Sequence, residues 1–214
     1  MNRLLLILVC AAVPLRGAEA PPEAGPVIAP GADDAAWRPL FAALAAKGGV
    51  EAAFTELRWF SFRAAPVELK GEMRFSPALG LSLLYFEPER RLVVADAKGL
   101  LVRDARGRAH ELPAGTRGLA SIAAMLSVMR FDLASLERTF EVHGARAGSA
   151  WRLDFVPRDP GQARVLGRLV VYGEDEAVRR LEFRHSAKQR VEIVIGETRT
   201  GVEFGSGAQR RFFR

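Results

Sequence analysis

Apolar and polar residues alternate along much of the chain, most clearly in the segment VELKGEMRF at residues 67–75. Its apolar side chains and Gly71 fall on one side of an extended backbone, and its charged side chains fall on the other. The pattern predicts a β-strand with one face in water and one apolar face. The functional question is whether this apolar face covers the protein's own core or a ligand that the protein carries.

Segments with the same alternation follow one another from residue 50 to residue 112 and again from residue 139 to residue 200. Each is short, and turn residues separate it from the next, which is typical of an antiparallel meander. The pattern indicates about five strands in the first stretch and about five in the second. A sheet of about ten strands curls, splits or closes, so we expect a strongly curled antiparallel sheet.

Helical spacing replaces this alternation near the start of the predicted domain. Asp33 and Asp34 offer an N-cap, and Gly48-Gly49 ends the helix. The apolar residues on one face of this helix are Trp37, Leu40, Phe41 and Leu44. An amphipathic helix of this kind packs its apolar face against a core.

A second helical region interrupts the series of strands at residues 117–130. Asp132 then offers an N-cap for a short helix at residues 133–140. The apolar residues at helical spacing in the first of these helices are Leu119, Ile122, Met125, Leu126 and Met129. We expect the helices to lie against the concave face of the sheet.

The chain begins with a short basic stretch and an apolar run, LLLILVCAAV, that is too short to span a bilayer. The sequence AEA follows at the spacing that a signal peptidase accepts, so residues 1–20 are predicted to be a cleaved signal peptide. We expect a periplasmic protein, with a retained anchor as the alternative. The only cysteine, Cys10, lies in this segment, and the mature chain is therefore predicted to contain no disulfide.

Two further segments flank the single predicted domain at residues 33–204. Residues 21–32 are rich in proline and are predicted to be a linker that does not pack. Residues 205–214, GSGAQRRFFR, are predicted to be a flexible basic tail, with contact to a membrane as the alternative.

The composition, with 49% hydrophobic and 26% charged residues, is that of a globular protein. The formal net charge of +6 comes largely from scattered arginines. We expect a solvated surface, with attraction to anionic lipid or to an acidic partner as the alternative. Nucleic-acid binding requires a clustered basic face, which the alternation of arginines with apolar residues does not indicate.

Residue types that carry out catalysis or bind metals are present but scattered. His110, His143 and His185 stand far apart, without the ligand spacing of a zinc site. The nucleophile elbow G-x-S-x-G, a glycine-rich phosphate loop and the zinc motif H-E-x-x-H do not occur. The sequence therefore predicts no enzyme, no metal site and no cofactor.

Several segments, in their order along the chain, resemble the periplasmic outer-membrane lipoprotein carrier family LolA, or a LolA-like branch of it. The matching features are Phe54, Gly71, the strand end Phe75-Ser76-Pro77, Tyr85, the hairpin VVADAKGLLVRD and the W-x-L-x-x-x-P-R-D run from Trp151 to Asp159. The resemblance covers about residues 34–200 and depends on the order of these diffuse motifs.

The resemblance implies an α+β fold in which an incomplete, strongly curled antiparallel β-barrel encloses an apolar cavity under a helical lid. It implies a carrier that takes the acyl chains of a lipoprotein from an inner-membrane exporter and passes them to an outer-membrane receptor. We expect a monomer that contacts membranes only transiently. The residues predicted to line the cavity and its lid are Phe60, Phe62, Leu69, Met73, Phe75, Leu83, Tyr85, Leu119, Ile122, Met125, Leu126 and Met129.

One position departs from the family pattern. Family carriers commonly have an arginine immediately before the proline that matches Pro77, and this arginine acts in release of the cargo. Here the position is Ser76, and Arg74 on the same face of the strand is the predicted substitute. The departure leaves open a branch that carries other membrane lipids or pigments.

Two other interpretations remain open at this level. The apolar residues on the strands are also of the types that fill a closed core. A sensor or regulatory module on the same fold, of the type of RseB, would bind a protein partner without transport.

Overall fold

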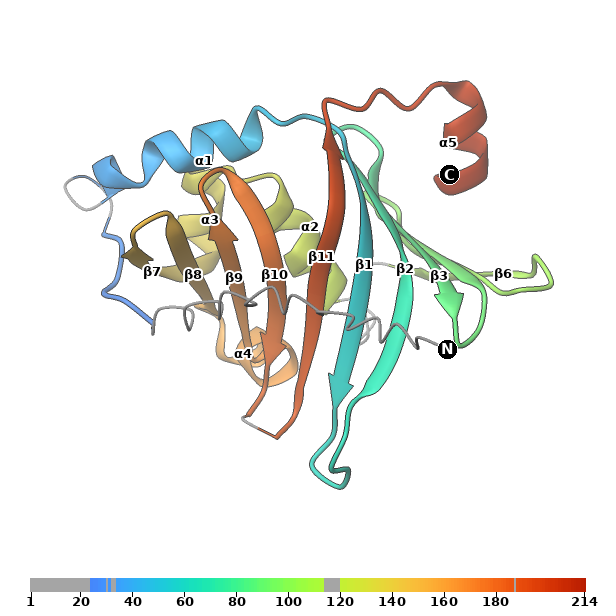
Figure 1. Cartoon of the computed structure of the whole chain (residues 1–214), viewed down its shortest axis with the longest axis horizontal. Coiled ribbons are helices and arrows are strands. Elements are labelled where there is room, and N and C mark those ends of the chain that lie inside the picture. Colours follow the sequence, from blue (N-terminus) through green and yellow to red (C-terminus); the bar gives the residue numbers. More distant parts are fainter. Residues whose placement is uncertain (1–23, 30, 32–33, 114–119, 187) are drawn as a thin grey trace, which may run out of the picture.

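The computed structural model describes residues 24–29, 31, 34–113, 120–186 and 188–214. Its main element is one antiparallel sheet of 11 strands (Figure 1). The strand order is β6-β5-β4-β3-β2-β1-β11-β10-β9-β8-β7, so two meanders meet where the first strand pairs with the last. The strands are β1 (Val50–Trp59), β2 (Val67–Ser76), β3 (Gly80–Glu87), β4 (Arg91–Asp96), β5 (Gly99–Arg103), β6 (Ala109–Pro113), β7 (Phe140–Ala147), β8 (Ala150–Pro157), β9 (Arg168–Glu174), β10 (Ala177–Arg184) and β11 (Arg190–Thr200).

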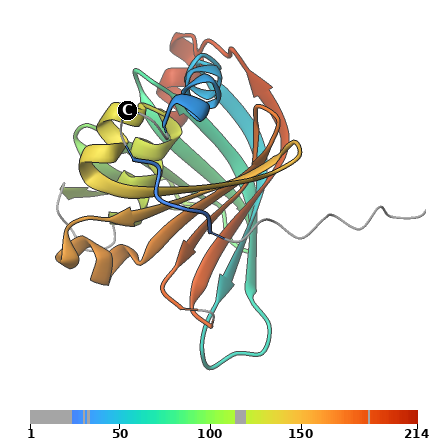
Figure 2. The same cartoon turned by 90° about the vertical axis from the view of Figure 1, so that its left-hand side faces the viewer.

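The sheet is strongly curled but does not close, as Figure 2 shows from the side. Register shifts lie between Ala52 and Phe54 on β1 and between Lys70 and Gly71 on β2. Irregularities of this kind increase the local twist and bend a strand. The edges of the sheet are β6 and β7. Between these two strands in the sequence lie two helices, at Ala120–Met129 and Leu133–Thr139. The expectation of a curled, incomplete antiparallel barrel is confirmed.

The helices lie on both sides of the sheet (Figures 1 and 2). They are a 3-10 turn η1 (Asp34–Ala36) and the α-helices α1 (Arg38–Ala45), α2 (Ala120–Met129), α3 (Leu133–Thr139), α4 (Pro160–Leu166) and α5 (Ser206–Phe212). The first three α-helices pack on the concave face, and the predicted apolar face of α1 is buried there. None of the helices in the described part of the chain has the length and apolarity that crossing a bilayer requires.

The predicted helix caps are confirmed in one case and differ in the other. The Asp132 carboxylate accepts a hydrogen bond from the Ser135 backbone N–H at 3.3 Å and caps α3 as expected. The N-cap of α1 is Trp37, so the prediction that Asp34 caps this helix is wrong. Asp34 is instead buried at the start of η1, where its carboxylate accepts a hydrogen bond from Arg38 at 2.8 Å. Asp33 lies outside the described residues.

The segment at residues 24–29 packs, although the proline-rich stretch was expected to stay unpacked. The backbone N–H of Ile28 donates to Val142 on the edge strand β7 at 2.8 Å, and the Gly144 N–H donates to Pro26 at 3.1 Å. The Ile28 side chain is buried in the main core. A Cβ at Gly144 would lie 2.4 Å from the Trp37 ring, so this close approach requires glycine. The segment thereby covers part of an otherwise open sheet edge.

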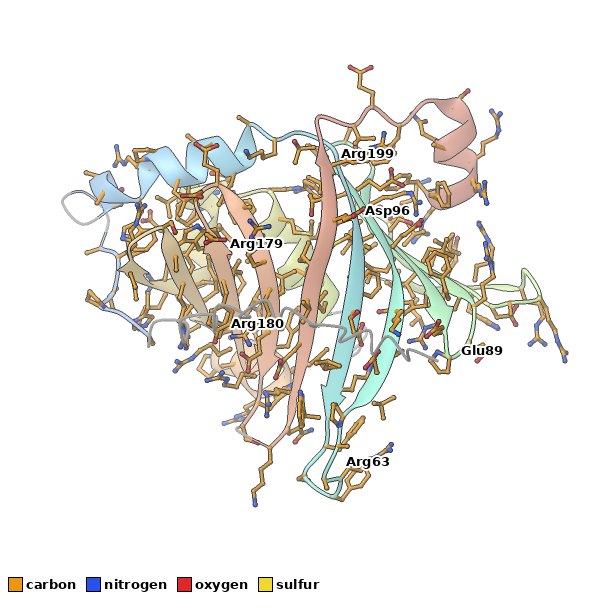
Figure 3. The ribbon with its side chains drawn as sticks, viewed as in Figure 1. Arg63, Glu89, Asp96, Arg179, Arg180 and Arg199 are labelled. Atoms are coloured by element: carbon orange, nitrogen blue, oxygen red, sulfur yellow. The ribbon has the colours of Figure 1, made fainter. Side chains whose placement is uncertain are left out.

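The C-terminal residues form a helix and a second core, where the sequence indicated a flexible tail. Phe213, only 1% exposed, packs with Leu84, Leu92 and Val94, on the face of the sheet opposite the main core. The Arg214 guanidinium lies 2.9 Å from the carboxylate of Asp96, which Figure 3 labels to the lower left of α5. The local sequence lacks a helical pattern, so contact with the convex face of β3 and β4 determines the conformation.

Charged residues on the convex face of β8 to β11 are more buried than a solvated strand face would be. Asp154 is 0% exposed and accepts from Arg152 at 2.6 Å, and Glu182 is 1% exposed and accepts from Arg184 at 2.8 Å. The aliphatic stems and guanidinium groups of the arginines lie over the carboxylates and shield them from water. The expectation of a fully solvated surface is therefore wrong for this face.

We predict that Phe213→Ala lowers the free energy of unfolding by about 3–5 kcal/mol, because it leaves a cavity in the convex core. Phe62→Ala is the matched control, since Phe62 is 80% exposed and its removal is expected to change stability by less than about 0.5 kcal/mol. Urea denaturation of both variants measures the difference. Equal stability of the two variants would show that α5 does not pack as described.

Candidate functional site

A cavity on the concave side has a volume of about 440 Å³, within the range of small-molecule sites. It lies between the C-terminal end of α1, the start of β1, the α2–α3 junction and strands β2, β10 and β11. Its inner wall is apolar and is formed by Leu44, Val50, Ala52, Met73, Phe75, Met129, Phe131, Val178, Leu181 and Ile195. We call it the upper cavity.

The rim of the upper cavity is polar. Lys47 at the end of α1 donates to Glu176 in the β9–β10 turn at 3.2 Å, which ties two sides of the opening together. Arg130 and Arg179 also line the cavity, and both residues are exposed. Figure 3 shows Arg179 on β10. An apolar interior with charged residues at its opening suits a ligand that has an apolar and a polar end.

A second cavity of about 350 Å³, the lower cavity, lies toward the β1–β2 and β10–β11 turns. Its wall contains a buried polar cluster beside apolar side chains. Glu56, 4% exposed, accepts a hydrogen bond from the Tyr85 hydroxyl at 2.6 Å and from Arg58 at 2.5 Å. Burial raises the pKa of Tyr85, and the neighbouring Glu56 carboxylate raises it further. The Trp59 indole N–H, which is also in this wall, is buried without a hydrogen-bond partner among the described residues.

Phe54 lies between the residues of the two cavities on β1. Ala52 lines the upper cavity and Glu56 the lower, while the buried Phe54 ring packs edge-to-face on Tyr85 at 5.3 Å. A Cβ at Gly71 on the neighbouring strand would lie 2.9 Å from this ring, so glycine makes the space that the ring occupies. The middle of the β2 apolar face is therefore closed by Phe54.

The structure divides the predicted cavity residues between these features. Met73, Phe75 and Met129 line the upper cavity, and Phe60, Leu83, Tyr85 and Met125 line the lower one. Leu69 is buried in the core without lining either cavity, and Phe62 stacks on Phe60 at the exposed end of the β1–β2 hairpin. Leu119 lies outside the described residues, as does the side chain of Ile122.

Helix α2 is rotated relative to the predicted apolar stripe. Met125 and Val128 are almost fully buried, whereas Leu126 and Met129 are only partly buried. Sequence reasoning missed Phe131, which lines the upper cavity and packs on Phe41 with ring centroids 6.2 Å apart. Its φ of +49° is unusual for a bulky residue and turns the chain between α2 and α3.

The position of Arg74 does not support its predicted role as a substitute release residue. Its guanidinium lies on the convex face, 2.7 Å from the Glu51 carboxylate and 3.7 Å from the centroid of the Phe212 ring. Ser76 also faces away from the cavity, and its hydroxyl accepts from the Leu79 N–H at 3.3 Å in the following turn. Arg130 and Arg179 are the arginines that reach the upper cavity.

Metal-binding groups do not gather in the described part of the chain, where no three His, Cys, Asp or Glu side chains form a cluster that could hold an ion. His143 lies beside Glu141, with Nε2 2.8 Å from the carboxylate, and His185 lines the lower cavity.

We predict a loss of stability in alkaline solution that depends on Tyr85. Its pKa is raised in the folded state above the usual value of about 10, so folding favours the protonated phenol. The contribution is fully present below pH 10 and is lost as the pH rises toward the folded-state pKa. Urea denaturation from pH 8 to pH 11 should show a steeper decrease for the wild type than for Tyr85→Phe. Parallel curves would contradict the buried Glu56–Tyr85 pair.

Comparisons with known proteins agree with this architecture. The family model described as outer membrane lipoprotein carrier protein LolA-like matches residues 27–201. No curated protein sequence matches the chain significantly.

Solved structures similar to this chain share little sequence with it. A putative outer membrane lipoprotein-sorting protein domain from Vibrio parahaemolyticus is 9% identical, with 82% of this chain and 94% of that chain covered and a TM-score of 0.44. A LolA superfamily protein from Nitrosomonas europaea is 6% identical, with 78% and 94% covered and a TM-score of 0.44. MucB is 16% identical, with a TM-score of 0.43; the match covers 83% of this chain and 62% of MucB.

The family match spans nearly all of the described sheet, from the segment that covers β7 to the end of β11. Members of this family are carriers and binding proteins that act outside the cytoplasm. The chain belongs to the LolA-like family of outer-membrane lipoprotein carrier proteins.

Proposed function

We propose that this protein is a periplasmic carrier that binds acyl chains of lipoproteins, or of similar amphipathic lipids, in the cavities of its concave face. The observation that carries the proposal is the upper cavity, which has an apolar wall, a polar rim and room for part of an acyl chain. The family match supports the proposal independently of the geometry. We further propose that an inner-membrane exporter supplies the cargo and an outer-membrane receptor accepts it.

The energetics of acyl transfer favour such an enclosed site. Each methylene group that leaves water contributes about 0.8 kcal/mol, so a long chain cannot cross an aqueous compartment at useful concentration without being covered. Met73 and Met129 lie on opposite sides of the upper cavity, on β2 and α2. Their flexible thioethers adapt to chains of different length and branching.

The polar rim suits the other end of the cargo. Arg130 and Arg179 are exposed at the opening, where their guanidinium groups reach the carbonyl or phosphate oxygens of a lipid whose tail is inside. In this proposal, these two arginines act in release of the cargo, the role that the arginine before the proline has in family carriers. The lower cavity accepts a second chain or a longer one, with the free Trp59 N–H as a donor.

Native mass spectrometry of the protein purified from an envelope fraction tests the carrier role. We expect adducts of acyl-chain mass that disappear on organic extraction, and lipid analysis of the extract then gives the cargo class. A clean unliganded mass, together with no uptake of a fluorescent fatty acid, would contradict the proposal. A stable complex with a membrane protein in place of lipid would favour a regulatory module instead.

We predict that Ile195→Glu weakens binding of a fluorescent fatty acid by at least about tenfold, because it places a charge on the wall of the upper cavity. Val194→Glu is the matched control, since Val194 is the preceding residue on β11, is 40% exposed and faces the other side of the sheet. Fluorescence titration compares the two variants after circular dichroism has shown that both fold. Equal binding by the two variants would contradict a cargo site in the upper cavity.

A further inference from the structure

Two arginines of the first meander and one of the C-terminal helix meet at a pocket on the convex face. Arg90 lies in the β3–β4 turn, Arg103 at the end of β5 and Arg211 in α5, and they line a pocket of about 210 Å³. Its apolar floor is formed by Leu84, Leu92 and Phe212, which belong to or pack against the second core. We call it the arginine pocket; it shares no residue with the upper or lower cavity.

The arginines of this pocket differ from Arg74, Arg152 and Arg184 on the same face of the sheet, whose guanidinium groups pair with carboxylates. Among the described residues, Arg90, Arg103 and Arg211 form no ion pair; the Arg211 guanidinium lies 5.0 Å from the Phe212 ring centroid. The acidic residue in the lining, Asp104, is already paired with Arg108 at 2.7 Å. Arg91 also contributes to the lining, but its guanidinium lies over the Tyr85 ring at 4.5 Å.

The carboxylates near the pocket are outnumbered by its cations, since Asp104 is the acidic residue of a lining that contains Arg90, Arg91, Arg103 and Arg211. Glu89, labelled in Figure 3, is exposed in the same turn as Arg90 and pairs with no cation among the described residues. Arg106 in the β5–β6 turn adds another exposed cation beside Asp104. The region thus keeps a local positive charge that is available to a ligand.

Apolar side chains continue from the floor of the pocket to its edge. Tyr85 opposes Arg91 in the antiparallel β3–β4 register, which places the following residue, Phe86, beside Arg90. The Phe86 side chain is 41% exposed and lies on the same face as Leu84. Free cations next to an exposed aromatic ring are the combination by which proteins bind the interface of an anionic membrane.

We propose that the arginine pocket binds the phosphate group of an anionic phospholipid at a membrane surface, with Phe86 entering the headgroup region. Guanidinium groups match phosphate oxygens in a two-pronged geometry, and three of them enclose one phosphate from different sides. The contact would hold the carrier at a bilayer through its convex face while the concave cavities stay free. The site is separate from the cargo cavities, so either assignment can fail without the other.

Vesicle co-sedimentation of the mature protein tests this site. The probes are phosphatidylcholine vesicles with and without phosphatidylglycerol, at one fixed ionic strength. The pocket variant is Arg90→Gln, Arg103→Gln and Arg211→Gln together. The control variant is Arg63→Gln, Arg164→Gln and Lys188→Gln, which removes the same charge from exposed positions outside the pocket; Figure 3 shows Arg63 at the far end of the β1–β2 hairpin.

We expect wild-type protein to bind only the vesicles that contain phosphatidylglycerol, and the pocket variant to bind them about a hundredfold more weakly. The control variant should stay within about threefold of the wild type, because none of its cations lines the pocket. Fatty acid uptake should be the same in all three proteins. If the triple pocket variant does not fold, single Arg90→Gln and Arg103→Gln variants should each weaken binding about fivefold.

Three results would overturn the proposal. Equal weakening in the pocket and control variants would mean that total charge, and no particular site, attracts the protein to the vesicle. Equal binding of the wild type to phosphatidylcholine alone would mean apolar adhesion. Binding of soluble glycerol phosphate without any binding to anionic vesicles would assign the pocket to a small phosphate ligand.

Discussion

The curl of an open 11-stranded sheet encloses more space than the side chains of its inner face fill, and the rest of the molecule follows from how that space is divided. The two meanders bend around the same side, and register shifts in the pairing of β1 with β11 and of β2 with β3 increase the local bend. Helices α1, α2 and α3 fill only part of the concavity. The space that they leave is the upper and lower cavities, separated along β1 by Phe54.

The two faces of the sheet meet different physical demands. The concave face is apolar and loosely filled, which an exchangeable hydrophobic ligand requires. On the convex face, α5 closes an apolar cluster and arginines cover the buried carboxylates of Asp154 and Glu182. The convex face thus buries apolar and charged groups, whereas the concave face leaves the upper and lower cavities.

Much of the fold could be predicted from the sequence because its strands alternate cleanly and its turns are marked. The capping residue Asp132 and the buried face of α1 also came from local signals. The helix α4 had such a signal that was overlooked, since Asp159 caps it through the Gln162 N–H at 2.7 Å and Pro160 begins it. The helix α5 had none, because GSGAQRRFFR lacks a helical pattern and is ordered by tertiary contact.

The site was harder to predict for a specific reason. Alternation identifies which side chains face inward, but whether they meet a ligand or one another depends on strand curvature and on the rotation of α2. Met73 and Leu69 share one face of β2, yet Met73 lines the upper cavity whereas Leu69 packs against other side chains in the main core. The pairing of β4 with β5 brings Arg90 and Arg103 together, but only the position of α5 adds Arg211 to them.

The pairing of β1 with β11 also determines when the protein can fold. The first and last strands pair at the centre of the sheet, so residues remote in sequence are in contact there. Proteins whose contacts join residues remote in sequence fold slowly. Until residues 190–200 have been synthesised, each meander has an unpaired inner edge and an uncovered apolar face. Such intermediates aggregate readily, so the chain itself needs shielding until its last strand has been synthesised.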